Sequence, residues 1–209
     1  MRNGLLLNGR HVKQSRRVNF GHFFFIMLGA GFSYMALVNH FVALVVDVGF
    51  TAMFAANLLL IYAVIIMLGR GCGFISDAIG VEMAFTVSMI MMLFSLLMLF
   101  FVKDTSSPWM LYGFIALSAF GGGMYIPAYG AAAADLFQGK NFGSIIGFAN
   151  MGFGIGAGIG TWLYGLIFDI TGNYSLAIII TMIAVCVMGA AIWVAAPRKV
   201  RRIGRASRV

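Results

Sequence analysis

Long apolar runs alternate with short polar stretches along the chain. A helix needs about 20 apolar residues to cross the hydrocarbon core of a bilayer, and each run is long enough to do so. The stretches between the runs hold most of the charged and turn-forming residues that lie outside the two termini. The pattern predicts an all-α membrane protein with six transmembrane helices, at residues 19–46, 51–75, 83–102, 108–134, 142–168 and 174–196.

Composition favours the same class of protein. Of the 209 residues, 62% are hydrophobic and 10% are charged, and the mean hydropathy is +0.98. A soluble domain carries about 25% charged residues, so this composition is typical of a protein that lies in a bilayer.

The basic residues lie mainly at the two ends of the chain. A net charge of +8 could indicate nucleic-acid binding, but eleven of the fourteen lysines and arginines precede the first apolar run or follow the last. An even number of spans places both ends on one side of the membrane, and the positive-inside rule makes that side cytoplasmic. We expect a multi-pass protein of the cell (inner or plasma) membrane, with a basic tail at 1–18, a bundle at 19–196 and a basic tail at 197–209.

Two similar segments indicate an internal repeat. GFISDAIG (73–80) ends the second run and GLIFDITG (165–172) ends the fifth, with four of eight residues identical and a separation of 92 positions. Three spans separate the two copies, so the copies face opposite sides of the membrane. Such a G-x-x-x-D-x-x-G segment also describes an ordinary helix end. Its equivalent place in both triplets nevertheless predicts two inverted three-helix repeats, an architecture common in secondary transporters.

Polar residues at membrane depth occur in four of the six runs. The first, second, fourth and fifth runs contain amides, hydroxyls, phenols or a charge, whereas the third and sixth are almost purely apolar. Polar groups at this depth usually face a protein interior or a wet cavity. We therefore expect the third and sixth spans to face lipid and the other four to line a cavity, although the same side chains could serve only hydrogen bonds between helices. The candidates are Tyr34, Asn39, Asn57, Tyr125, Tyr129 and Asn150.

The stretch GFGIGAGIG (152–160) allows three interpretations. A dinucleotide-binding loop would need a preceding strand and a βαβ unit, and a membrane strand would need a closed barrel; the sequence shows neither. In a helix, glycines at this spacing form two strips without side chains, which let neighbouring helices approach closely and slide. One strip contains Gly152, Gly156 and Gly160, and the other contains Gly143, Gly147, Gly154, Gly158 and Gly165. We expect a packing helix.

These features together resemble the major facilitator superfamily, and specifically the C-terminal six-helix half of a twelve-helix carrier. The segment from Gly73 through Asp77 to Gly80 is similar to the superfamily's signature loop between its second and third, or eighth and ninth, helices. Ala78 replaces the usual arginine and Val81-Glu82 replaces the usual basic pair, a weakening that is commoner in second-half copies. The resemblance implies that Gly73, Asp77 and Gly80 form a gating loop; Asp77 could also be a solvated loop charge.

Within the superfamily, the chain is most similar to the monocarboxylate-porter and oxalate–formate branch, on Asn39-His40-Phe41-Val42, Leu68-Gly69-Arg70 and the segment from Asp135 to Gly143. This resemblance implies secondary active transport of a small organic anion such as a monocarboxylate, by proton symport or anion exchange. Alternating access requires two six-helix halves around a midplane site. The second half is expected from a longer form of the same chain, from a separate chain or from a homodimer.

Arg70 is the leading candidate for substrate binding. The resembling branch uses an intramembrane arginine on this helix for a carboxylate, which a guanidinium fork suits well. Arg70 could instead extend to the membrane surface or pair with Asp77. His40, inside the first span, could relay a proton or serve as a hydrogen-bonded packing residue. Pro127 is expected to bend the fourth span.

No grouping of residues suits an enzyme, a metal site or a cofactor, because His11, His22 and His40 are scattered and no nucleophile has a neighbouring base. The alternative to a carrier is a non-transporting six-helix scaffold or degenerate half-carrier. The missing loop arginines and the lack of an acidic residue within a span favour that alternative. A channel would need a ring of like charges or a filter segment, and the sequence shows neither.

Overall fold

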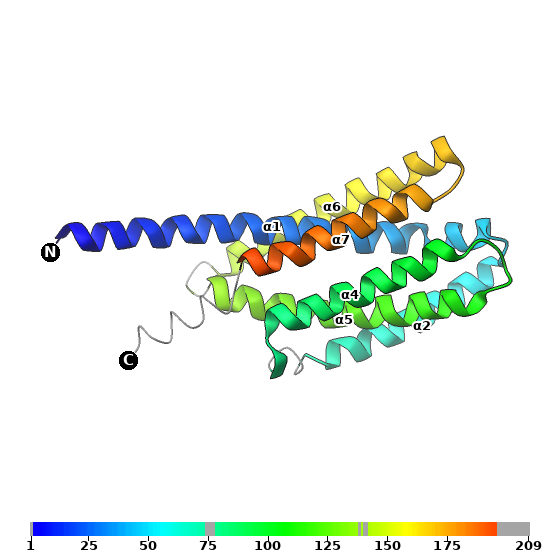
Figure 1. The fold of residues 1–209 in the computed structure, drawn as a ribbon, viewed down its shortest axis with the longest axis horizontal. Helices are drawn as coiled ribbons and strands as arrows, with labels where there is room; N and C mark the ends of the chain where they lie inside the picture. The colour runs from blue at the N-terminus through cyan, green and yellow to red at the C-terminus, as the bar shows by residue number, and fades with distance from the viewer. Residues whose placement is uncertain (1, 74–77, 138, 140–141, 196–209) are drawn as a thin grey trace.

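The computed structural model describes residues 2–73, 78–137, 139 and 142–195. In these ranges the chain forms six long helices: α1 (Arg2–Asp47), α2 (Ala52–Gly71), α4 (Val81–Phe101), α5 (Pro108–Phe137), α6 (Phe142–Thr171) and α7 (Ser175–Ala195). All six are long and apolar enough to cross a membrane, which confirms the predicted all-α class. Figure 1 shows them running roughly along one axis as an elongated bundle.

The first helix departs most from its predicted bounds. It begins at Arg2 and runs for 46 residues, although the part that could span a membrane is Phe20–Asp47. A helix extends easily once it is nucleated, and the residues before Phe20 include no proline to stop it. In Figure 1 this first part of α1 projects beyond the bundle. We call the end from which it projects the tail end, and the opposite end the far end.

Tight turns connect the helices at the far end. Between α1 and α2, Gly49 has a φ of +107°, and the Thr51 hydroxyl then accepts a hydrogen bond from the backbone N–H of Phe54 at 3.2 Å. Between α6 and α7, Gly172 has a φ of +69°. Glycine adopts these left-handed conformations without strain. Both turns therefore fall where the sequence has a glycine.

The contacts between helices follow the predicted inverted repeat. The first helix of each triplet packs on the second helix of the other triplet, α1 on α6 and α5 on α2. The third helix of each triplet packs on the first helix of the other, α4 on α5 and α7 on α1, and α4 also meets α7. Exchanging the two triplets leaves this pattern of main contacts unchanged. Gly80 and Gly172, at matching places in the repeated segment, both have positive φ.

One of the two predicted glycine strips of α6 packs on α1. A Cβ added at Gly152 would lie 2.9 Å from the Phe24 carbonyl oxygen, and one at Gly160 would lie 2.6 Å from the Phe32 carbonyl oxygen. These distances leave no space for a side chain, so the two backbones touch. The partners advance by four residues on both helices, which means that α1 and α6 run parallel. The facing positions are Gly152, Gly156 and Gly160 on α6 and Phe24, Leu28 and Phe32 on α1.

The other strip is uncovered along most of its length. A Cβ added at Gly154 or Gly158 would meet no atom within 4 Å in the described part of the chain. Only Gly165 of this strip has a neighbour, the ring of His40 at 3.7 Å. If Gly154 and Gly158 have the packing role that the sequence predicts, the helix that they pack against lies outside this bundle, and that role stays a prediction.

Burial differs between the six helices. The aromatic and aliphatic core lies mainly between α1, α4, α5 and α7. On α2 only Ala55, Leu58 and Gly69 are buried. The spans predicted to face lipid, α4 and α7, each bury one face in the core and expose an apolar outer face. The second helix of each triplet is thus the least covered, which suits a helix that has a further partner.

Candidate functional site

Arg70 lies in the last turn of α2, near the tail end, and its side chain is exposed. No hydrogen bond or ion pair joins its guanidinium to another residue in the described ranges. Asp77, the partner that the sequence suggests, lies outside those ranges. The electrostatic neighbour of Arg70 is the phenol of Tyr62, two turns earlier on the same helix. Within the described ranges, therefore, no residue occupies the donors of the guanidinium, and they are available to a ligand.

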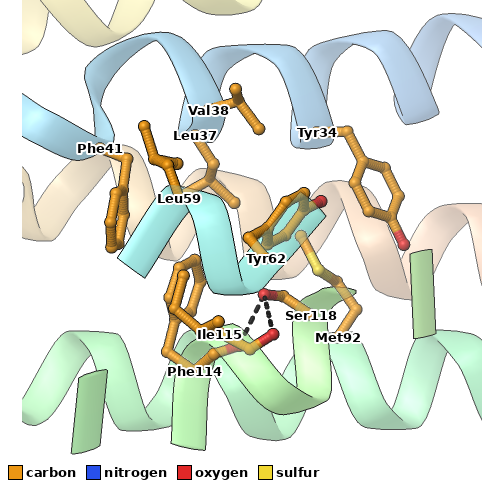
Figure 2. A pocket seen from close by; sticks show the side chains of 10 residues that line it. All are labelled: Tyr34, Leu37, Val38, Phe41, Leu59, Tyr62, Met92, Phe114, Ile115 and Ser118. Atoms are coloured by element: carbon orange, nitrogen blue, oxygen red, sulfur yellow. Dashed lines mark hydrogen bonds between the residues drawn. The ribbon is translucent and has the colours of Figure 1, made fainter. Parts of the chain in front are cut away.

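A second phenol, that of Tyr34 on α1, lies near Tyr62. The two phenols lie close enough to interact electrostatically, and both line the pocket shown in Figure 2. Tyr34 is only 8% exposed, and its hydroxyl has no hydrogen-bond partner among the described residues. Leaving a buried hydroxyl unpaired costs about 1–3 kcal/mol, so this group favours the arrival of a ligand or a water molecule.

A column of aromatic rings extends from Tyr34 toward the tail end. Tyr34 and Tyr125 have ring centroids 6.0 Å apart, Tyr125 and Tyr129 are 6.1 Å apart, and Tyr129 and Phe23 are stacked at 4.4 Å. The Tyr125 hydroxyl meets only the sulfur of Met27, at 3.8 Å, and the buried Tyr129 hydroxyl has no partner in the described chain. The candidates Tyr34, Tyr125 and Tyr129 therefore belong to one aromatic wall between α1 and α5.

The pocket in Figure 2 lies where α1, α2 and α5 converge, and Met92 of α4 also lines it, beside Ser118. Its free volume of about 10 Å³ is about enough for one water molecule. Apart from the two phenols, its polar group is the Ser118 hydroxyl, which already donates to the Phe114 carbonyl oxygen at 2.6 Å. The pocket is thus nearly filled, with an apolar interior and one phenol each from α1 and α2 in its lining.

His40 occupies a different place, between α1 and α6. Its Nε2 lies 2.9 Å from the Thr161 carbonyl oxygen, so this nitrogen carries the proton and donates. The neighbouring Asn39 amide donates to the Thr161 hydroxyl at 2.9 Å. Gly165, one turn after Thr161, has no side chain to cover that carbonyl, and the His40 ring packs there. The rings of Tyr164 and Tyr174, each 5.7 Å from the imidazole, complete the surroundings.

Arg70 and His40 do not form one site. Arg70 lies 18 residues from the far-end start of α2, and His40 lies 7 residues from the far-end terminus of α1. At 1.5 Å per residue, the two backbones differ in depth by about 16 Å. The structure therefore separates the candidate anion ligand from the candidate proton relay.

An open hollow of about 500 Å³ lies beside the Asn39–Thr161 hydrogen bond. Gly158 forms part of it, so the uncovered glycine strip and the hollow are one surface. Its lining residues are Met35, Asn39, Ala157, Gly158, Thr161 and Trp162.

The remaining candidates lie apart from these two sites. Asn57 on α2 and Asn150 on α6 are exposed, and no side-chain hydrogen bond joins either to the described chain. A Cβ added at Gly73 would lie 3.2 Å from the Pro127 ring, so the start of the predicted gating loop touches α5. Asp77 lies outside the described residues. Helix α5 is continuous through Pro127.

Neither Tyr62 nor Thr161 is among the candidate site residues predicted from the sequence. Tyr62 precedes Arg70 by eight residues, a spacing that places both on one face of a helix, and this signal could have identified it. Thr161 meets His40 through its backbone carbonyl, for which no residue type is diagnostic, and it meets Asn39 through its hydroxyl.

Comparisons with known proteins agree with this architecture. The family model described as Major Facilitator Superfamily matches residues 23–208. Among solved structures, the chain is similar to that of an Escherichia coli fucose:proton symporter variant, FucP, with a TM-score of 0.63 and 23% identity. The match covers 87% of this chain and 43% of the symporter chain, so this chain spans less than half the length of that protein. No curated protein matches. With a family model that matches almost the whole bundle, the chain belongs to the major facilitator superfamily.

Proposed function

We propose that the chain is the C-terminal half of a secondary active transporter for a small organic anion such as a monocarboxylate. The observation that carries this proposal is Arg70, an exposed arginine at the end of a membrane-spanning helix, with no ion-pair partner in the described ranges. A charge at this depth is costly unless it is paired or hydrated. Because the chain belongs to a family of transporters, the partner we propose for the Arg70 guanidinium is a transported anion rather than an intermediate of an enzymatic reaction.

The groups around Arg70 suit a carboxylate. The guanidinium offers two parallel donors that match the two carboxylate oxygens. The phenols of Tyr62 and Tyr34 are further donors, and the Tyr34 hydroxyl is unpaired in the described chain. The apolar pocket beyond them would receive the hydrocarbon part of the anion once it opens. A neutral solute would leave the charge of Arg70 without compensation.

His40 is the proposed coupling residue. Its Nε2 is held by the Thr161 carbonyl, so protonation would take place at Nδ1 without breaking that hydrogen bond. The resulting imidazolium would tighten the link between α1 and α6 by strengthening a charge-assisted bond. Proton symport would use this step, whereas anion exchange would not need it.

The second half would dock on α2 and α6. These helices are the least buried, and they expose Asn57 and Asn150, which would be unfavourable in lipid. The hollow beside Gly158 is lined by α1 and α6, and it has room for a side chain from the second half. We place the tail end in the cytoplasm and the protein in the plasma membrane, because the basic residues gather at its two termini.

Counterflow in proteoliposomes tests this function. The chain, with any second half that co-purifies, is reconstituted into liposomes. The liposomes are loaded with unlabelled formate, lactate or oxalate, and their uptake of the same labelled anion from outside is measured. Accumulation above that of empty liposomes is expected, and Arg70→Gln should abolish it while Arg70→Lys retains part of it, because lysine keeps the charge and loses the fork. Equal uptake by Arg70→Gln would refute the anion site.

The second candidate function is a non-transporting six-helix scaffold. The small free volume of the pocket favours it, since about 10 Å³ holds no solute. A scaffold would show no counterflow with any of the three anions, and its Arg70→Gln variant would behave like the unsubstituted protein.

A further inference from the structure

Three consecutive glycines of α5 each meet a different helix. A Cβ added at Gly121 would lie 3.1 Å from the Ser88 carbonyl oxygen of α4. One at Gly122 would lie 2.6 Å from the Tyr34 ring of α1, and one at Gly123 would lie 2.5 Å from the Ile66 carbonyl oxygen of α2. Successive residues of a helix point about 100° apart, so three adjacent positions can face three neighbours. This segment of α5 is therefore the junction of three helices.

The last two of these glycines touch the two elements of the anion site. The Cβ position of Gly122 is 3.1 Å from the Tyr34 hydroxyl oxygen. The Cβ position of Gly123 is 2.9 Å from the backbone nitrogen of Arg70 and 2.7 Å from the Cα of Gly69. Gly122 thus contacts the end of the Tyr34 side chain, and Gly123 contacts the backbone that carries the Arg70 guanidinium.

We propose that Gly122 and Gly123 are positioning residues for the anion site. They set the distance between the Tyr34 hydroxyl and the backbone that carries the Arg70 guanidinium, because adjacent residues of one helix keep a constant separation. This inference rests on the proposed function. Neither glycine needs to touch the anion; Gly122 acts through Tyr34, and Gly123 acts through Arg70.

The two glycines differ in what a substitution would displace. At Gly122 the obstructing atoms belong to the far end of the Tyr34 side chain, so Gly122→Ala should move the hydroxyl without separating two helix backbones. At Gly123 the obstructing atoms are backbone, so Gly123→Ala must separate α2 from α5 and lowers stability as well. Gly122→Ala is therefore the decisive variant, and Gly123→Ala is the supporting one.

Equilibrium binding of radiolabelled lactate and oxalate to the purified chain, with any co-purifying second half, tests the proposal. Gly122→Ala is expected to raise the Kd of the better-bound anion about tenfold, which corresponds to the loss of one hydrogen bond. Two alanine variants serve as controls. Gly130→Ala lies in open space on α5, and Gly160→Ala places its Cβ 2.6 Å from a backbone oxygen in the remote α1–α6 contact. Both should leave the Kd within about twofold.

A double-mutant cycle separates positioning from general loosening. Tyr34→Phe should itself raise the Kd, and adding Gly122→Ala to it should have an effect of less than about twofold, because the hydroxyl that the glycine positions is gone. Fully additive losses, an unchanged Kd in Gly122→Ala, or an equal loss in Gly160→Ala would each overturn the positioning role. If the unsubstituted protein binds neither anion, the proposed function itself is refuted.

Discussion

Gly31 of α1 and Gly123 of α5 hold equivalent places in the two halves of the bundle. They are 92 residues apart, as are Gly80 and Gly172, and each lies where the first helix of its triplet crosses the second helix of the other. At both crossings the space for a Cβ is taken by backbone of the partner helix. The inverted repeat is therefore built on two matching glycine contacts.

The same separation relates Arg70 to Trp162. Both are exposed, and both lie on the second helix of a triplet close to its crossing with the first helix of the other. Arg70 has the Tyr62 phenol as its electrostatic neighbour, whereas Trp162 borders the open hollow with Asn39. The two repeats thus share the same helix contacts, but the residues beside the two helix crossings differ: one crossing has the charged Arg70, and the other has the uncharged Trp162.

The two glycine strips of α6 should respond in opposite ways to a methyl group. Gly156→Ala would drive a Cβ into the Leu28 backbone of α1, so we expect the free energy of unfolding to fall by about 1–3 kcal/mol. Gly158→Ala meets no atom within 4 Å and should be neutral or stabilising by up to about 1 kcal/mol, because alanine favours the helix. Unfolding in mixed detergent micelles measures both. Equal losses in the two variants would contradict the assignment of the strips.

The hydrogen bond between Tyr164 and Thr181 should contribute measurably to the contact between α6 and α7. The two hydroxyl oxygens are 2.7 Å apart and fully buried. Tyr164→Phe should lower the unfolding free energy by about 0.5–1.5 kcal/mol. Tyr112→Phe is the matched control, since Tyr112 is exposed and the same atom is removed there. A loss in the control as large as that in Tyr164→Phe would rule out a specific contribution.

Two substitutions of His40 should distinguish a role in proton coupling from a role in helix packing. Glutamine carries an amide N–H that can reach the Thr161 carbonyl but does not titrate near neutral pH. We expect His40→Gln to keep anion exchange and to lose the dependence of uptake on an imposed pH gradient. His40→Ala should in addition lower the unfolding free energy by about 1 kcal/mol. Gradient-driven uptake that persists in His40→Gln would exclude His40 as the coupling residue.

The pKa of Tyr174, in the turn before α7, should lie above that of an exposed tyrosine. Burial raises the pKa of its phenol, and the nearby carboxylates of Asp47 and Asp169 raise that pKa further. Because the folded-state pKa exceeds the unfolded value of about 10, this group stabilises the fold fully below pH 10, and the contribution disappears as the pH rises through the folded pKa. Ultraviolet difference titration against Tyr174→Phe measures the pKa, and Asp47→Asn should lower it. An unchanged value in Asp47→Asn would show that the Asp47 carboxylate does not act on this phenol.

The number, type and approximate bounds of the helices could be predicted from sequence. Hydropathy and length are local properties, and a bilayer requires a continuous apolar run for each crossing. The repeat of Gly73–Gly80 at Gly165–Gly172 likewise predicted the inverted triplets without any coordinates. Arg70 was identifiable for the same reason, because a charge within an apolar run is conspicuous.

The partners of each residue were decided only by the tertiary structure. Gly154 and Gly156 look equivalent in sequence, yet one faces open space and the other touches Leu28. Arg70 and His40 both lie within spans, yet they differ in depth by about 16 Å. Which side of a helix is covered depends on its rotation and register against neighbours distant in the chain. Those variables are set by close packing of the whole bundle, which hydropathy along a single helix does not specify.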